Sequence, residues 1–247
     1  MIRAVLFDFG GTLYDYACLQ AAERESFAEL IGWAGVDADP PTVQRAYRES
    51  MRGVFRTYLP QPFYYHRDLF RDAAAGMLES LGARPEPEIL DRYRRAQWQR
   101  HARDFRLRDG VHETLQELRR RGLHLGIVSN IDEDQLGHLI DLGELRSRFD
   151  SLLSSEHARS CKPDQGIYQE ALRRAGCSAG EALFVGDTLL QDIAGANRAG
   201  MRSVLIWHRD DTEPPTDKGV VPHHVIRQIP DLLDLVGTSG DRPTTPG

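Results

Sequence analysis

The chain of 247 residues contains only two lysines, Lys162 and Lys218, so that 29 of its 31 basic residues are arginine. Coding bias is the plain explanation for such a preference. Where lysine is nevertheless used, it supplies a compact and flexible ammonium group rather than the planar guanidinium of arginine. The scarcity of lysine therefore marks Lys162 as a candidate functional residue.

Other shortages exclude whole classes of protein. The sequence has no run of about 18 apolar residues, which argues against a membrane-spanning helix. Its net charge of −6 gives no electrostatic basis for binding nucleic acid. The cysteines (Cys18, Cys161 and Cys177) are odd in number and lack metal-type spacing, so we expect reduced thiols in a cytoplasmic protein. We expect no signal peptide, because Asp8 interrupts the only early apolar stretch.

Three short apolar runs each stop at a polar residue. The first ends at Asp8, the second (125–128) at Ser129 and the third (183–185), after one glycine, at Asp187. Short apolar runs separated by helical patterns are typical of buried parallel strands. In an open parallel sheet the ligand crevice lies at the carboxyl ends of the strands. We therefore expect these three polar side chains to converge on one site.

The region between residues 15 and 106 has helical periodicity and no convincing strand. Alternation of helices and strands resumes after it. The expected helices are 16–31, 42–55, 67–81, 86–103, 111–121, 133–142, 163–175 (with Pro163 in the first position) and 190–200, and further strands are expected at 151–153 and 203–207. This order predicts an α/β fold whose parallel strands are joined by right-handed crossovers.

Four motifs occur in order along the chain. They are Asp8-Phe9-Gly10-Gly11-Thr12-Leu13, Ser129-Asn130, Lys162-Pro163-Asp164, and Gly186-Asp187 with Asp192 five residues later. Each motif alone is a weak signal, but all four in order, each at a strand end or a helix start, are specific. With them the chain resembles the haloacid dehalogenase-like hydrolase superfamily, whose members are mostly phosphatases that act through an aspartyl-phosphate.

The resemblance implies a two-part organisation. Residues 1–14 and 107–236 would form a Rossmann-like parallel-sheet core. Residues 15–106 would form an inserted α-helical cap domain, which matches the family only in its position and helical character. Residues 237–247 are polar and rich in proline and glycine, and we expect them to be a disordered tail.

The resemblance also implies a magnesium site. Asp8 would be the nucleophile. It would also be a Mg²⁺ ligand, together with the main-chain carbonyl of Gly10 and the carboxylate of Asp187, because Mg²⁺ prefers oxygen ligands. Asp192 would support the metal from the second layer of contacts or through water, and a helix-surface or capping role is the alternative.

The resemblance implies further roles in binding phosphate. Ser129 and Asn130 would donate hydrogen bonds to phosphate oxygens, although both residue types equally suit the N-terminus of the following helix. Thr12 would orient the loop of the first motif. Lys162 would stabilise the nucleophile and the charge of the transferring phosphoryl group. The implied catalytic residues are Asp8, Ser129 and Lys162, and the implied substrate-binding residues are Thr12, Ser129, Asn130 and Lys162.

Gly10 is the one departure from the family pattern. The family normally carries a second aspartate at this place, which protonates the leaving alcohol and later activates water. Its loss would slow the hydrolysis of ordinary phosphate esters, because general acid-base help is worth about 10²–10⁴-fold. Residues that could substitute are Tyr64, Tyr65 and His66 in the cap and His112 and His157 in core loops, and the sequence does not choose among them.

The sequence leaves three functions open. The first is a Mg²⁺-dependent phosphatase for a small phosphorylated metabolite, acting as a monomer or homodimer. The second is a 2-haloacid dehalogenase that uses Asp8; that branch also lacks the second aspartate, but it needs no metal and does not keep the Gly186-Asp187 pair. The third is a catalytically silent binding or regulatory protein; Gly10 is the only support for it, and the presence of Lys162 together with Asp187 argues against it. A carbon–phosphorus cleaving enzyme is set aside, because that branch uses a cap lysine and residues 15–106 contain none.

Overall fold

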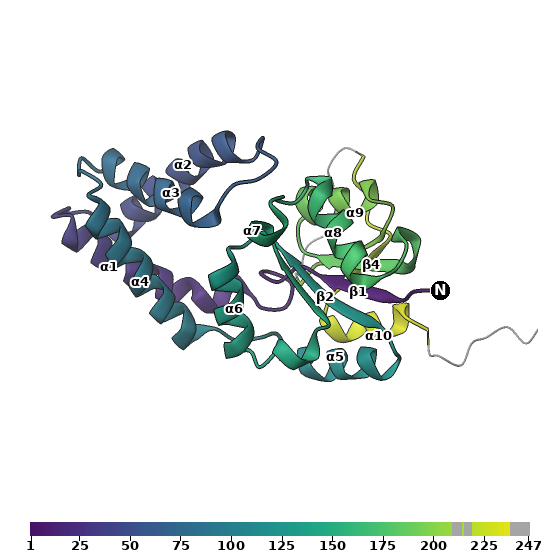
Figure 1. Cartoon of the computed structure of the whole chain (residues 1–247). Helices are drawn as coiled ribbons and strands as arrows, with labels where there is room; N and C mark the ends of the chain where they lie inside the picture. Colours follow the sequence, from purple (N-terminus) through teal and green to yellow (C-terminus); the bar gives the residue numbers. More distant parts are fainter. Residues whose placement is uncertain (209–213, 215–218, 238–247) are drawn as a thin grey trace, which may run out of the picture.

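The computed structural model describes residues 1–208, 214 and 219–237, so the expected tail, apart from Gly237, lies outside the described residues. At its centre is a six-stranded sheet in the order β3-β2-β1-β4-β5-β6, in which every neighbouring pair is parallel (Figure 1). The strands are β1 (Ala4–Phe7), β2 (His124–Ser129), β3 (Ser151–Ser154), β4 (Ala182–Gly186), β5 (Arg202–Ile206) and β6 (His224–Ile226). The predicted α/β fold with a Rossmann-like parallel sheet is confirmed, and β6 is a strand that the sequence did not indicate.

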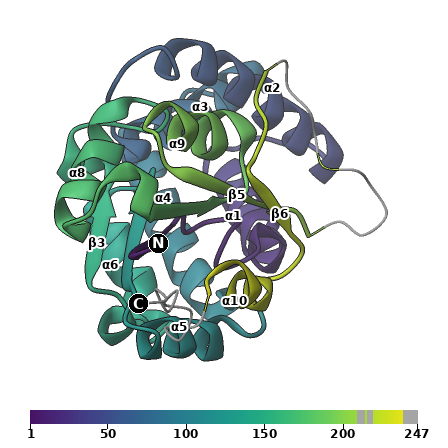
Figure 2. The ribbon, with the colours of Figure 1, turned by 90° about the vertical axis from the view of Figure 1, so that its right-hand side faces the viewer.

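Helices cover both faces of this sheet, so its central strands are buried on both sides. Because side chains alternate along a strand, Val5 and Phe7 pack into one apolar layer and Ala4 and Leu6 into the other. The first layer contains α5 (Val111–Arg120), α6 (Glu133–Leu142) and α10 (Leu232–Leu235), and the second contains α8 (Gln165–Ala175) and α9 (Ala194–Arg198) (Figure 2). Short elements complete the core: η2 (Arg146–Arg148), α7 (Ser155–Ala158), η3 (Ala179–Glu181) and η5 (Ile229–Asp231).

The order of the strands puts the first strand of the chain in the middle of the sheet. From β1 the chain adds β2 and β3 on one side, and then crosses back to add β4, β5 and β6 on the other. In such sheets the ligand crevice opens at the carboxyl ends of the strands where the order reverses, here between β1 and β4. Asp8 directly follows β1 and Asp187 directly follows β4, so both residues lie at this point.

A separate group of helices, which we name the cap helices, lies beyond the carboxyl ends of the strands (Figure 1). They are η1 (Tyr16–Leu19), α1 (Gln20–Trp33), α2 (Pro40–Tyr58), α3 (His66–Ser80) and α4 (Pro87–Asp104). The four helices α1 to α4 share an apolar cluster of their own, which includes the fully buried Leu30, Met77 and Leu78, whereas Leu19 of η1 packs into the core. The division of the chain into two domains at the predicted boundaries stays a prediction.

Asp132 joins the cap helices to the core. It directly precedes α6, yet its side chain does not cap that helix. Its two carboxylate oxygens instead accept backbone N–H groups at the start of α3, from His66 at 3.0 Å and from Arg67 at 2.6 Å. The Arg67 guanidinium also pairs with Glu156 of α7 at 3.1 Å. Because the first N–H groups of a helix lack partners within it, a core side chain here completes the N-terminus of a cap helix.

The start of α8 differs from the prediction. The sequence places Pro163 in the first helical position, but α8 begins at Gln165. The side chain of Asp164 accepts the N–H of Gly166 at 3.0 Å and so caps the helix at that point. The bond between Lys162 and Pro163 is cis. Since α8 begins two residues after Pro163, the prediction that Pro163 belongs to the helix is wrong.

The helix predicted over 190–200 is also divided in the structure. A π-helical turn, η4 (Leu189–Ile193), comes first, and α9 follows it. Such π turns are rare and occur frequently at functional sites. Among the helices of the described residues, none combines the length and the apolarity that a membrane crossing requires. The three cysteines are free thiols, as predicted.

Candidate active site

The loop that follows β1 and Asp8 is held tightly. Gly11 has a φ of +81°, a conformation that favours glycine, and its N–H donates to the carbonyl of Tyr14 at 2.9 Å. A Cβ atom on Gly11 would overlap the carboxylate of Asp187. Arg108, which follows the cap helices, donates to the carbonyl of Gly11 at 2.9 Å. Glycine is therefore required at this position, and the loop has a fixed shape.

Asp8 is the centre of a polar cluster. Its carboxylate accepts hydrogen bonds from Lys162 Nζ at 2.6 Å, Ser129 Oγ at 3.1 Å and Thr12 Oγ1 at 3.4 Å. Asp8 is only 6% exposed. Burial raises the pKa of Asp8 above its usual value, although the Lys162 ammonium opposes the shift. The structure thus brings together four side chains that the sequence predicts to act in one site.

Lys162 is positioned through its backbone and paired through its side chain. Oδ1 of Asn130 accepts the N–H of Lys162 at 2.7 Å, and Nδ2 of Asn130 donates to the Lys162 carbonyl at 2.9 Å. The buried ammonium lies 2.6 Å from one oxygen of Asp8 and 2.6 Å from one of Asp192. Burial alone would lower the pKa of Lys162, but the two carboxylates raise it above its usual value. The Asn130 amide therefore positions Lys162. A contact between Asn130 and phosphate stays a prediction.

Asp192 enters the cluster from the π-helical turn η4. Its Oδ1 accepts a hydrogen bond from Lys162. Its Oδ2 accepts the N–H of Thr188 at 2.9 Å and the Thr188 hydroxyl at 2.6 Å. Both oxygens are thus held by hydrogen-bond donors of the site, and the supporting role of Asp192 at the metal stays a prediction.

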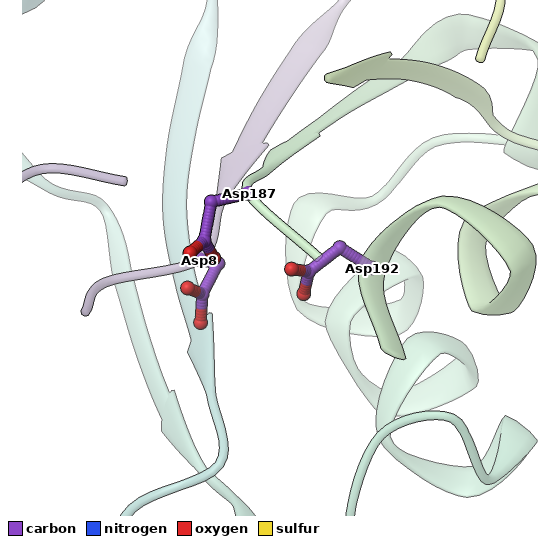
Figure 3. Close-up of side chains that lie close together, drawn as sticks. All are labelled: Asp8, Asp187 and Asp192. Atoms are coloured by element: carbon purple, nitrogen blue, oxygen red, sulfur yellow. The ribbon is translucent and has the colours of Figure 1, made fainter. Parts of the chain in front are cut away.

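The carboxylates of Asp8, Asp187 and Asp192 form an acidic cluster (Figure 3), in which one oxygen of each lies within 4.8 Å of the others. Carboxylate oxygens are the ligands that Mg²⁺ prefers, so the cluster offers a place for this ion. Lys162 supplies one positive charge against three carboxylates. Burial, with the charges of Asp8 and Asp192, raises the pKa of Asp187 to about 8. A divalent cation with oxygen ligands fits this excess of negative charge.

The cluster lines a cavity of about 350 Å³ whose walls come from both the core and the cap helices. Gly10, whose carbonyl stays a predicted metal ligand, also lines it. Of the described residues that line the cavity, Lys162 is the one lysine or arginine. The cap helices contribute a further group of lining residues, which includes Glu23, Tyr47, Leu69, Phe70, Gln97 and His101.

The sequence offers five substitutes for the missing acid and base, and two of them reach the cavity. Tyr64 and His66 line it, whereas Tyr65, His112 and His157 are not among its described lining residues. Burial lowers the pKa of His66 to about 4, and the charge of Lys162 contributes. Its imidazole is therefore neutral at neutral pH.

The structure adds a residue that the sequence reasoning missed. Tyr16 lies in η1, just after the loop of the first motif, and its hydroxyl group lies beside Gly10. Burial of this hydroxyl raises the pKa of Tyr16 well above its usual value, and the neighbouring Tyr14 and Asp8 add to the shift. The only signal in the sequence is its closeness to the motif, which does not reveal where the side chain points.

Comparison with protein families agrees with the motifs. The model described as haloacid dehalogenase-like hydrolase matches residues 5–206. The chain belongs to this family. It is therefore a hydrolase, and the match extends from β1 through the cap helices to β5.

Two relatives and two solved structures show how this haloacid dehalogenase-like hydrolase compares with others. It is 35% identical over 239 residues to the glyceraldehyde 3-phosphate phosphatase of Methanopyrus kandleri, covering 96% of this chain and 97% of the relative. It is 31% identical over 242 residues to the ribulose-1,5-bisphosphate 5-phosphatase of Halopiger xanaduensis, covering 96% and 100%. The structure of YfnB from Bacillus subtilis, bound to magnesium, matches with a TM-score of 0.76 at 22% identity, covering 95% and 98%. The L-2-haloacid dehalogenase of Xanthobacter autotrophicus matches with a TM-score of 0.75 at 22% identity, covering 95% and 98%.

Within this family fold, replacing Asp187 by alanine should greatly weaken Mg²⁺ binding. The affinity, measured by calorimetry on metal-free protein, should fall by more than about 100-fold, beyond the range typical of residues that only support a ligand. Asp134→Ala removes an exposed carboxylate that pairs with Arg94 outside the cavity, and it should leave the affinity unchanged. Unchanged binding in Asp187→Ala would remove Asp187 from the metal site.

Proposed function

We propose that this hydrolase is a Mg²⁺-dependent phosphatase that acts on a small phosphate monoester through an aspartyl-phosphate on Asp8. The observation that carries the proposal is the place of Asp8, a buried carboxylate at the end of the central strand that contacts Lys162 and faces a cavity. Such a carboxylate can attack phosphorus and divide hydrolysis into two easier steps. Similarity to two proteins named as phosphatases supports the same class. A cytoplasmic location, which the free cysteines support, and a monomeric or homodimeric state are part of the proposal.

The reaction would proceed in two steps. In the first, an oxygen of Asp8 attacks phosphorus, the bond from phosphorus to the ester oxygen breaks, and the departing oxygen takes up a proton. In the second, water attacks phosphorus and gives up a proton, and the bond from phosphorus to Asp8 breaks, which restores the carboxylate and releases phosphate. Lys162 and Ser129, already hydrogen-bonded to Asp8, would offset the charge of the phosphoryl group throughout.

The residues around Asp8 give its two oxygens different environments. Lys162 and Ser129 both donate to Oδ1, whereas Thr12 makes a longer contact of 3.4 Å with Oδ2. One oxygen can therefore attack phosphorus while the other binds the metal. Mg²⁺, held by Asp8, Asp187 and the Gly10 carbonyl, would supply neutralisation of charge between the nucleophile and the phosphate.

The cavity favours a monophosphate whose remainder carries no charge. Apart from Lys162, the described lining residues include no lysine or arginine. Burial lowers the pKa of His66 and His101 to about 4, so both are neutral. A second phosphate group would lack a cationic partner here, and burial of an unpaired charge is costly. Neutral polar groups such as those of Tyr47 and Gln97 suit a hydroxylated remainder.

The two alternative functions, a 2-haloacid dehalogenase and a catalytically silent binding protein, leave this pattern of charge unexplained. The carboxylate of a 2-haloacid would lie near Asp187, while Lys162 is already shared between two other carboxylates. The similarity to a haloacid dehalogenase structure, at 22% identity, shows the fold alone. A silent binding protein would have no use for so many buried charges, because their desolvation costs stability.

A substrate screen with the purified protein tests the proposal. With Mg²⁺, phosphate should be released from small monophosphates such as glyceraldehyde 3-phosphate, and a chelator should abolish the release. Ribulose 1,5-bisphosphate should be a poorer substrate than ribulose 5-phosphate, because of its second phosphate. Metal-independent release of chloride from 2-chloropropionate, with no phosphate release from any ester, would overturn the proposal in favour of a dehalogenase. Release of neither product would favour a silent protein.

A further inference from the structure

The space beside Gly10 is filled by the side chain of Tyr16. A Cβ atom built on Gly10 would overlap the Tyr16 hydroxyl oxygen, and it would lie 2.8 Å from Cζ of Tyr16 and 3.0 Å from the Tyr14 hydroxyl. Real Cβ atoms essentially never show such short contacts. The Tyr16 hydroxyl therefore occupies the place from which a side chain at residue 10 would extend.

Local contacts tie Tyr16 to the loop of the first motif. The side chain of Asp15 accepts the N–H of Ala17 at 2.8 Å and so caps η1, the turn that carries Tyr16. Arg108 bridges this turn and the loop, because it donates to Asp15 at 3.1 Å and to the carbonyl of Gly11 at 2.9 Å. Movement of Tyr16 relative to the loop is thereby restrained.

Tyr14 supports the Tyr16 hydroxyl from the core side. The two rings meet edge to face with centroids 5.4 Å apart, and both hydroxyl groups lie beside Gly10. Tyr14 is 5% exposed and packs against Phe9 and Phe105, with ring centroids 5.2 and 5.1 Å away. The Tyr16 ring is thus supported by a neighbour that is itself packed into the core.

Building on the proposed phosphatase function, we propose that the Tyr16 hydroxyl replaces the absent first-motif carboxylate as the acid and base of the reaction. As Asp8 attacks, the bond from phosphorus to the ester oxygen breaks, and the Tyr16 O–H gives its proton to that oxygen, so that an alcohol and a phenolate form. In the second step the phenolate takes a proton from the attacking water while the bond from phosphorus to Asp8 breaks. Tyr16 regains its proton over the cycle, and tyrosine is among the side chains that act in this way.

This assignment also accounts for the glycine. Any side chain at residue 10 would displace the Tyr16 hydroxyl, so Gly10 and Tyr16 depend on each other. Tyr64 and His66 also line the cavity, but the atoms nearest to a Cβ on Gly10 belong to Tyr16 and Tyr14. Tyr16 is therefore the residue in the position of the missing group.

Replacing Tyr16 by phenylalanine tests the proposal. The change removes one oxygen atom and keeps the ring that packs on Tyr14, so the fold should be unaffected. We expect kcat/KM for an alkyl phosphate to fall by about 10²-fold, the low end of general acid-base help. For p-nitrophenyl phosphate, whose leaving group needs no proton, kcat/KM should change little. Tyr58→Phe, whose hydroxyl bonds Asp72 at 2.7 Å outside the cavity, is the matched control and should leave both values unchanged.

The outcomes separate this inference from the function on which it rests. Equal losses on the two substrates would indicate a structural role for Tyr16, and the absence of any loss would indicate another proton donor. Either result overturns the inference while the phosphatase function stands. Failure of the unaltered protein to release phosphate from both substrates would instead overturn the proposed function and, with it, this inference.

A second pair of variants separates proton donation from packing. Tyr16→Ala should lose alkyl phosphatase activity, and adding Gly10→Asp should restore it by at least about tenfold, because the carboxylate then has the space that the ring has left. Gly10→Asp alone should not raise the activity, because aspartate and Tyr16 compete for one place. A clear gain in Gly10→Asp alone, or no recovery in the double variant with normal thermal unfolding, would overturn the proposal.

Discussion

Replacing Asp8 by asparagine should abolish phosphate release, with a loss of about 10⁴-fold or more in kcat. The amide keeps the size of the side chain but cannot attack phosphorus, and removal of a nucleophile from a covalent hydrolase costs this much or more. The protein should remain folded, because burial already opposes the charge of Asp8 and a neutral amide relieves that cost.

Phosphate release measures the rate. Acid quenching during turnover, followed by mass spectrometry of the peptide that contains residue 8, detects the intermediate. The unaltered protein should carry one phosphoryl group on Asp8, and the variant should carry none. Asp39→Asn exchanges one capping residue for another at the exposed N-terminus of α2, so this matched control should behave as the unaltered protein does. Turnover by Asp8→Asn at an ordinary rate would contradict the assignment of the nucleophile.

Replacing Lys162 by methionine should have the second largest effect, a loss of about 10²–10³-fold in kcat, as expected when one group that stabilises developing charge is removed. It should also lower stability when no metal is bound. The ammonium lies 2.6 Å from both Asp8 and Asp192, so its removal leaves two carboxylates facing each other in a buried site. Removing one partner of a buried ion pair costs about 3–5 kcal/mol.

Thermal unfolding with Mg²⁺ and with a chelator measures this second effect. Because a bound divalent cation can offset the unpaired carboxylates, the difference in Tm between the two conditions should be greater in Lys162→Met than in the unaltered protein. Arg159→Met removes a nearby cation whose guanidinium stacks on Phe63 at 4.4 Å, and it should change neither kcat nor this difference. Normal kcat in Lys162→Met would show that the ammonium does not act on the reacting group.

The meeting of the polar side chains could be predicted because it depends on where the strands end. Asp8, Ser129 and Asp187 each close an apolar run, and parallel pairing brings the carboxyl ends of β1, β2 and β4 to one edge. The helix at 133–142 was also predicted with its observed bounds, because its apolar period and its ending at Gly143 are local features. The sequence encodes such features within a few residues.

The remaining features depend on competition between side chains or on a single backbone angle. The residue type of Asn130 suits phosphate binding and helix capping alike, yet its amide pairs with the backbone of Lys162. The π turn that carries Asp192 breaks the ordinary helical period, so periodicity could not reveal it. Tyr16 reaches Gly10 because the loop turns at a residue with positive φ, and the sequence alone does not set the course of the chain after such a turn.

The carboxylate of Asp132 restrains the opening through which molecules would enter and leave the cavity. It holds the first amides of α3 while its own backbone begins α6, so the cap helices cannot lift from the core at this point without exposing the N–H groups of His66 and Arg67 together. His66 is also part of the cavity wall. The rate of deuterium uptake at these two amides would therefore report how often the cavity opens in the resting protein, separately from any chemical step.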